Sequence, residues 1–448
     1  MKKVIALLLA LVMVLALGAC SVEKTVETQA PETQPAAAEG TQAAAPEAAG
    51  DPVEISLWTY PVGNWGDQAT VDQILADFNA AYPNITVKVE YLAYGGDGDA
   101  KIDSAIEGGQ APDIVLEGPE RLVANWGAKG VMVDLADLWT DEVKADTYES
   151  VEAACKNAEG AYYEYPLCMT AHCMAINKEM FEAADALQYV DLETHTWTTE
   201  NFIKAVEALY ANGQENVAAI FCNGSGGDQG TRALVNNLYG GTFTDAAHTK
   251  YTCDSAENVK ALQTLVDLDA KGVHIDAAIN GGQEADLFAQ GQLAMSFCWN
   301  AATHSAREEV IGDNFEVIPM AFPSPEGTDT KLCGGIWGFG IFDNGDPARI
   351  EAAKTFVKWA ADENTVNSVA ASGFWSTRKS VTDVYPGDEM KEVYGSFMPY
   401  MGDYYNVIAG WTEARTAWAE MFQAIATGTD VQEAITTFTS TANAAAGA

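Results

Sequence analysis

The chain has 448 residues, with 24 basic and 64 acidic side chains and a formal net charge of −40. A surface this negative repels nucleic-acid phosphates and anionic lipid headgroups, which argues against both as partners. It also disfavours a free anionic ligand, and it is typical of a soluble exported protein.

The first 52 residues carry no signal of a folded core. Residues 1–20, MKKVIALLLALVMVLALGAC, combine a basic start with an apolar run that is too short for a membrane span, which indicates a secretory signal. Residues 21–52 are rich in Ala, Glu, Thr, Gln and Pro and contain no aromatic residue, so we expect a disordered tether. The remaining roughly 400 residues suit two lobes better than one core.

The first folded elements predict a parallel sheet. Val53, Ile55 and Leu57 alternate with polar residues, a helical repeat runs from Val71 to Tyr82, and a second alternating segment spans Ile85 to Tyr91. A strand, a helix and a strand in this order form a βαβ unit. Ligands of such sheets bind beyond the carboxyl ends of the strands, and the aromatic candidates there are Trp58, Tyr60 and Trp65.

Charged residues follow the next short strand, Ile114–Leu116. Glu117 ends it, and Glu120 and Arg121 come directly after. At a strand exit these groups can hydrogen-bond a polar ligand, but Glu120 and Arg121 fit the exposed first turn of a helix equally well.

Two later segments are candidates for crossings or ligand contacts. Residues 160–178 form a long extended apolar segment, which suits a passage between lobes. The loop 223–230, NGSGGDQG, follows a buried strand and can contact a ligand. It nearly matches a phosphate-binding turn, but Gln229 stands where the dinucleotide fingerprint requires glycine.

The segment Phe288–Asn300, FAQGQLAMSFCWN, indicates a helix end, a turn and a short strand from Leu293 to Phe297. We interpret it as a strand between the lobes, which places Trp299 and Asn300 in the cleft. The alternative is an ordinary buried strand end, because Trp is often part of a core. Further candidates near later strands and loops are Gly334, Gly335, Trp337, Trp375, Arg378 and Trp411.

The cysteines favour core packing over chemistry. Seven follow Cys20, and an odd number with irregular spacing is not a disulfide framework. Cys168, His172 and Cys173 lack a fourth metal ligand at a recognisable spacing, so core packing is the favoured interpretation there. We therefore expect neither a metal nor another cofactor.

The order of motifs resembles the extracellular solute-binding proteins of ABC importers, the family 1 group that includes maltose-binding proteins. Weak motifs in the family's order carry this resemblance: Leu17–Cys20, Ala111–Ile114, Tyr165–Pro166, Ala175–Lys178, Phe181, Trp197–Thr198, Phe288, Gly291, Ala294–Met295, Gly334–Gly335 and Arg378. The chain departs from the family's usual residues at Ile176, Cys298 and Ser376, which puts individual ligand contacts in doubt.

The resemblance implies an α/β fold of the two-lobed, type II periplasmic-binding-protein class, with a ligand cleft between lobes joined by a three-segment hinge. We expect the first lobe to contain residues 53–167 and 301–339, and the second to contain 168–300 and 340–448. The expected crossings lie at 167–172, 297–300 and 340–343.

The resemblance also implies a function. Leu17–Cys20 resembles a lipobox, so Cys20 would carry diacylglycerol and anchor an extracytoplasmic protein to the bacterial cell membrane. We expect a monomer without enzymatic activity that delivers a mono- or oligosaccharide to an ABC permease. The alternatives are a binding protein for a polyol, peptide or polyamine and a surface glycosidase. Clustered carboxylates in the cleft would favour a polyamine, whereas clustered Trp favours a sugar.

Overall fold

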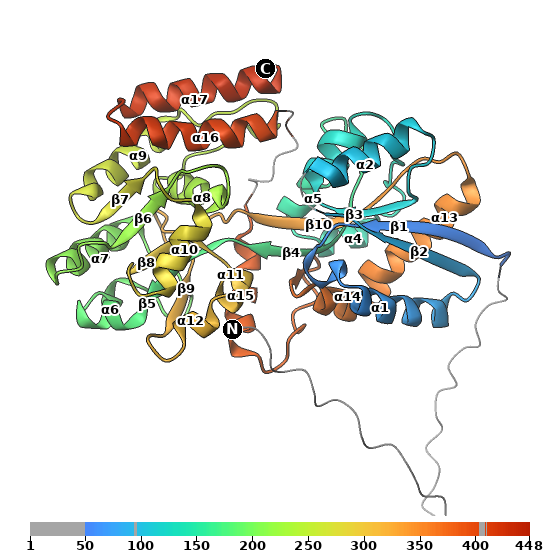
Figure 1. Cartoon of the computed structure of the whole chain (residues 1–448), viewed down its shortest axis with the longest axis horizontal. Coiled ribbons are helices and arrows are strands. Elements are labelled where there is room, and N and C mark those ends of the chain that lie inside the picture. Colours follow the sequence, from blue (N-terminus) through green and yellow to red (C-terminus); the bar gives the residue numbers. More distant parts are fainter. Residues whose placement is uncertain (1–49, 94–95, 403–407, 409) are drawn as a thin grey trace, which may run out of the picture. The chain divides into compact units, whose positions relative to one another are not determined.

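The structure is a computed structural model that describes residues 50–93, 96–402, 408 and 410–448. The secretory signal, Cys20 and nearly all of the expected tether lie outside the described residues. Figure 1 traces the elements along the chain. Within the described part of the chain, no helix combines the length and the hydrophobicity that a membrane crossing requires.

A six-stranded sheet is the centre of what we call the first lobe, and its strand order is β11-β4-β10-β3-β1-β2. β1 is parallel to both β2 and β3, so the predicted βαβ unit is confirmed. β10 is antiparallel to both β3 and β4. The strands are β1 Val53–Thr59, β2 Ile85–Tyr91, β3 Ile114–Glu117, β4 Tyr165–Ala171, β10 Gly334–Ile341 and β11 Trp375–Ser376.

The helices of the first lobe cover this sheet. α1, Gln68–Ala81, begins after Asp67, whose side chain accepts the backbone N–H of Thr70, and it buries the predicted apolar face that includes Phe78. α13, Pro347–Lys358, packs against β1 and β10. The others are α2 Gly96–Glu107, α3 Pro119–Arg121, α4 Asp141–Asp146, α5 Glu149–Ala154 and α14 Thr365–Ser372, with π-helical turns at Leu122–Gly127 and Trp359–Glu363.

The second lobe contains a three-stranded sheet, β8-β5-β9, and a parallel pair, β6-β7. Its strands are β5 Cys173–Asn177, β6 Ala218–Phe221, β7 Val273–Asp276, β8 Met295–Trp299 and β9 Val317–Met320. Two long C-terminal helices lie side by side on this lobe, α16 and α17 (Figure 1). The helices are α6 Lys178–Ala183, α7 Thr199–Ala211, α8 Asp228–Leu238, α9 Ala256–Asp269, α10 Gly281–Ala289, α11 Ala301–Ser305, α12 Glu308–Ile311, α16 Trp411–Ala426 and α17 Val431–Ala446.

In the described part of the chain, segments pass between the lobes after β4, after β9 and after β11. β4 ends at Ala171 in the six-stranded sheet and β5 begins at Cys173 in the other lobe, so the chain passes between the sheets at the end of the segment 167–172. The crossings predicted at 297–300 and 340–343 are wrong, because β8 pairs with β5 and α13 returns to the six-stranded sheet. The chain instead crosses between β9 and β10, and again between β11 and α16, where α15, Glu389–Gly395, lies.

The expected lobe boundaries need a matching correction. β9, expected in the first lobe with the rest of 301–339, pairs with β5 over four register positions, from Met174↔Met320 to Asn177↔Val317. The segment from 340 to 376, expected in the second lobe, supplies α13, α14 and β11 to the first. Local hydrophobic pattern shows that a strand exists but not which partner it pairs with, because pairing is a tertiary contact.

Candidate functional site

A cavity of about 1180 Å³ is lined by both lobes and by the two later crossings. The second lobe contributes the loop at 246–248, and the crossings contribute Lys331, Pro399, Met401 and Gly402. The first-lobe lining residues lie between positions 123 and 163 and include Tyr148, Glu149, Lys156, Glu159 and Tyr163. None of the residues predicted from the sequence to contact a ligand lines this cavity, although Trp375 lines a smaller one of about 310 Å³.

Tyr163 reaches this cavity because a glycine makes room for its ring. A Cβ atom on Gly127 would lie 2.5 Å from the ring of Tyr163, which is closer than side chains tolerate. Gly127 therefore lets the aromatic ring lie against the end of the π-helical turn at Leu122–Gly127. Tyr148 is the second aromatic residue of the lining, so the cavity offers two aromatic side chains beside its charged ones.

Four predicted residues meet in a polar cluster at the carboxyl ends of β1 and β3. Arg121 donates from Nε to Oδ1 of Asp99 at 2.7 Å and from Nη1 to Oε1 of Glu117 at 2.7 Å. Its guanidinium carbon lies 5.1 Å from the ring centre of Tyr60, whose hydroxyl donates to Asp99. Burial raises the pKa of Tyr60, so the hydroxyl keeps its proton and acts as a donor. Glu120 lies in the first helical turn after β3, next to Arg121.

Glu164 belongs to the same region, and the sequence analysis missed it. It is 0 % exposed, and neither carboxyl oxygen has a hydrogen-bond partner among the described residues. Burial, together with the nearby charges of Glu120 and Glu117, raises the pKa of Glu164 well above its usual value. The local run YYEYP gave no signal for this, because a glutamate between aromatic residues reads equally well as the solvent face of a strand.

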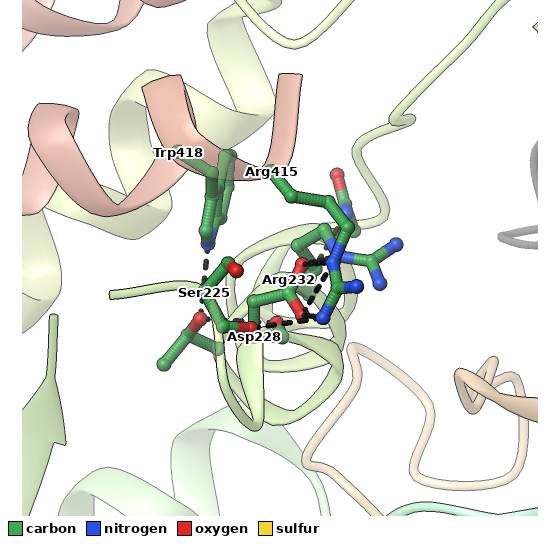
Figure 2. Close-up of polar contacts among 7 residues, drawn as sticks. Ser225, Asp228, Arg232, Arg415 and Trp418 are labelled. Carbon is green, nitrogen blue, oxygen red and sulfur yellow. Dashed lines mark hydrogen bonds and ion pairs between the residues drawn. The ribbon is translucent and has the colours of Figure 1, made fainter. Parts of the chain in front are cut away.

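The second lobe has its own charged cluster at the start of α8 (Figure 2). Oδ2 of Asp228 accepts from Nε of Arg232 at 3.0 Å, and Oδ1 accepts from Nη2 of Arg415 at 2.7 Å. Arg415 also donates to the carbonyl oxygen of Ser225 at 2.9 Å, and Nε1 of Trp418 donates to Thr231 at 2.9 Å. These contacts fix the loop after β6 to α16.

Two members of this cluster are buried. Asp228 is 3 % exposed and Arg232 is 2 % exposed, so each charge is stabilised by the ion pair between them instead of by water. Arg232 also lies over the ring of Trp411, with 4.6 Å between the guanidinium carbon and the ring centre. The sequence analysis named the 223–230 loop and Trp411 but not the arginines. No pattern in the neighbouring sequence could have identified Arg415, because its partner Asp228 lies 187 residues earlier in the chain.

His172, in the first crossing, lies near this cluster. Its backbone N–H donates to the carbonyl oxygen of Cys333 at 2.8 Å and so joins two crossings. Its Nδ1 atom is buried and has no hydrogen-bond partner in the part of the chain that the structure describes. Burial lowers the pKa of His172 to about 4, with the charge of Asp228 opposing this shift and those of Arg232 and Arg415 adding to it, so the ring is neutral near pH 7. In the described part of the chain, all seven cysteines are free and buried, and no three His, Cys, Asp or Glu side chains are placed to hold a metal ion.

Several predicted aromatic contacts are core residues instead. Trp65 and Trp299 are 0 % exposed, and their indole N–H groups bond to the carbonyl of Ser368 at 3.0 Å and to the hydroxyl of Tyr394 at 2.8 Å. Trp375 is 7 % exposed. Trp299, predicted to lie in the cleft, is instead fully buried, because all residues of β8 are buried and its indole packs against Tyr394 of the third crossing.

The other predicted residues have local roles. Asn300 caps α11 by accepting the backbone N–H of Thr303 at 2.8 Å, and Arg378 is buried between Thr147 and Asp362. A Cβ on Gly334 would lie 2.1 Å from the carbonyl oxygen of Thr170, so this glycine permits strand pairing between β10 and β4. A Cβ on Gly335 would strike the ring of Trp337.

The remaining three tryptophans are partly accessible. Trp58 and Trp337 are half-buried, the first beneath Lys101 and the second stacked on Phe374 with 4.9 Å between ring centres. Trp411 is also half-buried at the start of α16. Among the predicted residues, the structure thus brings together Tyr60, Glu117, Glu120 and Arg121, and it leaves the tryptophans dispersed.

Comparison with known proteins decides the family. Residues 63–366 match the model of the bacterial extracellular solute-binding proteins, and this span is well over half of the chain. The chain belongs to this family. No individually curated protein matches the sequence.

Solved structures of solute-binding proteins share the fold at low sequence identity. A cyclic α-maltosyl-1,6-maltose binding protein from Arthrobacter globiformis has a TM-score of 0.69 at 19 % identity, and the match covers 88 % of this chain and 99 % of that one. An ABC substrate-binding protein from Listeria monocytogenes in complex with cycloalternan has a TM-score of 0.63 at 19 % identity, covering 89 % and 100 %. One from Agrobacterium radiobacter K84 in complex with ribitol has a TM-score of 0.62 at 22 % identity, covering 88 % and 99 %. The expected two-lobed α/β fold of a periplasmic solute-binding protein is confirmed.

Proposed function

We propose that this solute-binding protein is a lipid-anchored, extracytoplasmic component of an ABC importer that captures a carbohydrate between its lobes and delivers it to the permease. It acts as a monomer without catalytic activity of its own. Diacylglycerol on Cys20 would hold it at the membrane, and the segment 21–52 would act as the tether. The ligands named for the structural relatives, which include two cyclic oligosaccharides and ribitol, support a saccharide or polyol as the ligand class.

The observation that carries this proposal is the cavity lined by both lobes. A ligand in it contacts the first-lobe segment 123–163, the second-lobe loop 246–248 and both later crossings at once. Such a ligand stabilises the closed state, because an open state offers it only part of these contacts. At about 1180 Å³ the cavity exceeds the 300 to 1,000 Å³ that small-molecule sites usually have, which leaves room for an oligosaccharide.

We expect a bound saccharide to raise the melting temperature by a few degrees and to reduce the radius of gyration. Binding adds RT ln(1 + [L]/Kd), about 2.7 kcal/mol at a hundredfold excess over Kd. The measurement is a thermal-shift screen over mono- and oligosaccharides, polyols, peptides and polyamines, followed by small-angle scattering with each hit. Hydrolysis of a sugar without compaction of the protein would instead identify a glycosidase.

A further inference from the structure

The polar cluster of the first lobe holds more acid than base. Arg121 pairs with Asp99 and Glu117 at 2.7 Å each, and Glu164 lies near Glu117 and Glu120. The contact of Arg121 with Glu120 is longer, at 3.6 Å between Nη1 and Oε1. One guanidinium therefore cannot balance the four carboxyl groups, even when Glu164 is protonated.

Two members of this cluster have buried oxygens without a partner. Both carboxyl oxygens of Glu164 and Oε2 of Glu120 are buried and accept no hydrogen bond from a described residue. A buried carboxylate without donors is costly, so each of these oxygens requires a proton or a donor.

The side chain of Glu164 points toward the other two glutamates. A Cβ on Gly338 would lie 2.8 Å from Oε1 of Glu164, and Gly338 is the residue that faces Glu117 across the β10–β3 pair. The charges that act most strongly on Glu164 are those of Glu120 and Glu117. The three carboxyl groups thus converge at the carboxyl end of β3, which is the end where sheets of this kind bind ligands.

The cluster adjoins the wall of the 1180 Å³ cavity. Val123 and Ala124, which follow Arg121, line the cavity, and so does Tyr163, which precedes Glu164. Glu120 is the glutamate that solvent reaches, with 27 % of its side chain exposed, whereas Glu117 and Glu164 lie behind it at 1 % and 0 %. A ligand group that enters here meets Glu120 first, with the carboxyl groups of Glu117 and Glu164 behind it.

We propose that Glu117, Glu120 and Glu164 form a subsite for a protonated primary amine, so that the ligand of this protein carries an ammonium group. An ammonium supplies a positive charge and three hydrogen-bond donors, which the buried oxygens of Glu120 and Glu164 can accept. A neutral hydroxyl supplies a donor but no charge. This inference rests on the proposed function for the saccharide part of the ligand, and an amino sugar satisfies both. A polyamine has the same ammonium chemistry without the sugar.

Matched ligands test this inference by isothermal titration calorimetry at pH 7. The probes are glucose, glucosamine and N-acetylglucosamine, the corresponding trimers of glucosamine and N-acetylglucosamine, and putrescine and spermidine. We expect an amine to bind at least tenfold more tightly than its acetylated partner, because acetylation removes the charge and leaves the ring unchanged.

Three variants locate the site. Glu120→Gln and Glu164→Gln should each weaken amine binding at least tenfold, and both are isosteric. Glu107→Gln, at an exposed position at the end of α2, removes the same charge from the chain and should leave amine binding unchanged. If Glu164→Gln fails to fold, the amine affinity of Glu120→Gln, at a half-buried position, tests the subsite alone.

The possible outcomes separate this inference from the proposed function. Equal binding of amine and acetylated sugars overturns the amine subsite and leaves carbohydrate binding intact. Binding of polyamines alone supports the subsite and overturns the carbohydrate assignment. An amine affinity that survives both glutamate substitutions, or no binding by any amine, overturns the subsite.

Discussion

Replacing Trp299 with alanine is expected to destabilise the protein by about 3 to 5 kcal/mol, the usual cost of deleting a buried indole ring. Trp299 is 0 % exposed and packs edge to face on Phe288, with 5.0 Å between ring centres. Its N–H donates to Tyr394, whose hydroxyl also bonds Nδ1 of His304 at 3.0 Å. Urea denaturation followed by fluorescence measures the loss.

Because of the position of Tyr394, Trp299→Ala should destabilise the protein by more than the cavity left by the ring would do alone. Tyr394 belongs to α15 in the third crossing, so the Trp299–Tyr394 hydrogen bond fixes that crossing to the core of the second lobe. Tyr394→Phe, which removes only the hydroxyl, should cost about 1 to 3 kcal/mol because it leaves the indole N–H buried without an acceptor.

Trp58→Ala is the matched control for a partly accessible tryptophan. Trp58 is half-buried and lies beneath Lys101, so its removal should cost clearly less stability than that of Trp299. A Trp299→Ala variant that keeps wild-type stability and loses ligand binding would contradict the core assignment and restore Trp299 as a cleft residue.

Glu284→Gln is expected to make the protein more stable than wild type at pH 8 and about equally stable at pH 4. Glu284, on α10, is 0 % exposed, and burial raises its pKa to about 8 despite hydrogen bonds from Ser296 Oγ at 2.7 Å and from the backbone N–H of Phe297 at 2.6 Å. The folded protein therefore holds a proton that the unfolded chain releases near pH 4.5.

The direction of this pH dependence follows from the difference between the pKa values of Glu284 in the folded and the unfolded protein. A folded-state pKa above the unfolded value means that the contribution of Glu284 is fully present below about pH 4.5 and is lost as the pH rises to about 8. A shift of this size corresponds to up to about 5 kcal/mol. Glutamine keeps both hydrogen bonds, because its oxygen can accept from Phe297 and its amide can donate to Ser296, and it does not titrate.

Denaturation curves at pH 4, 6 and 8 measure this difference. Glu257→Gln, at an exposed position in the first turn of α9, serves as the control and should follow the wild type at each pH. Parallel curves for wild type and Glu284→Gln across this range would show that Glu284 does not hold a proton in the folded protein.

The sequence by itself determined the elements whose patterns are local. The alternation at Val53–Leu57, the helical repeat of α1 and the second alternating run fixed the first βαβ unit, because the periods of strand and helix are written into consecutive residues. The first crossing was predictable for a similar reason, since 160–178 is too long and apolar an extended segment for one strand of one sheet. The sequence analysis could name Glu117, Glu120 and Arg121 because the end of a strand is visible in the local sequence.

Only the tertiary structure decided which segments pair and which aromatic residues are accessible. β9 joins β5 rather than the first lobe, and Arg415 reaches Asp228 across 187 residues, through contacts that no local pattern encodes. The tryptophans show the same limit, because an indole suits a core and a sugar face equally well. In the folded chain, Trp299 is fully buried against Phe288 and Tyr394. Glu164, a residue with no distinguishing local signal, is buried beside Glu117 and Glu120. The free energy of a buried charge depends on what surrounds it, and that is settled only when the chain folds.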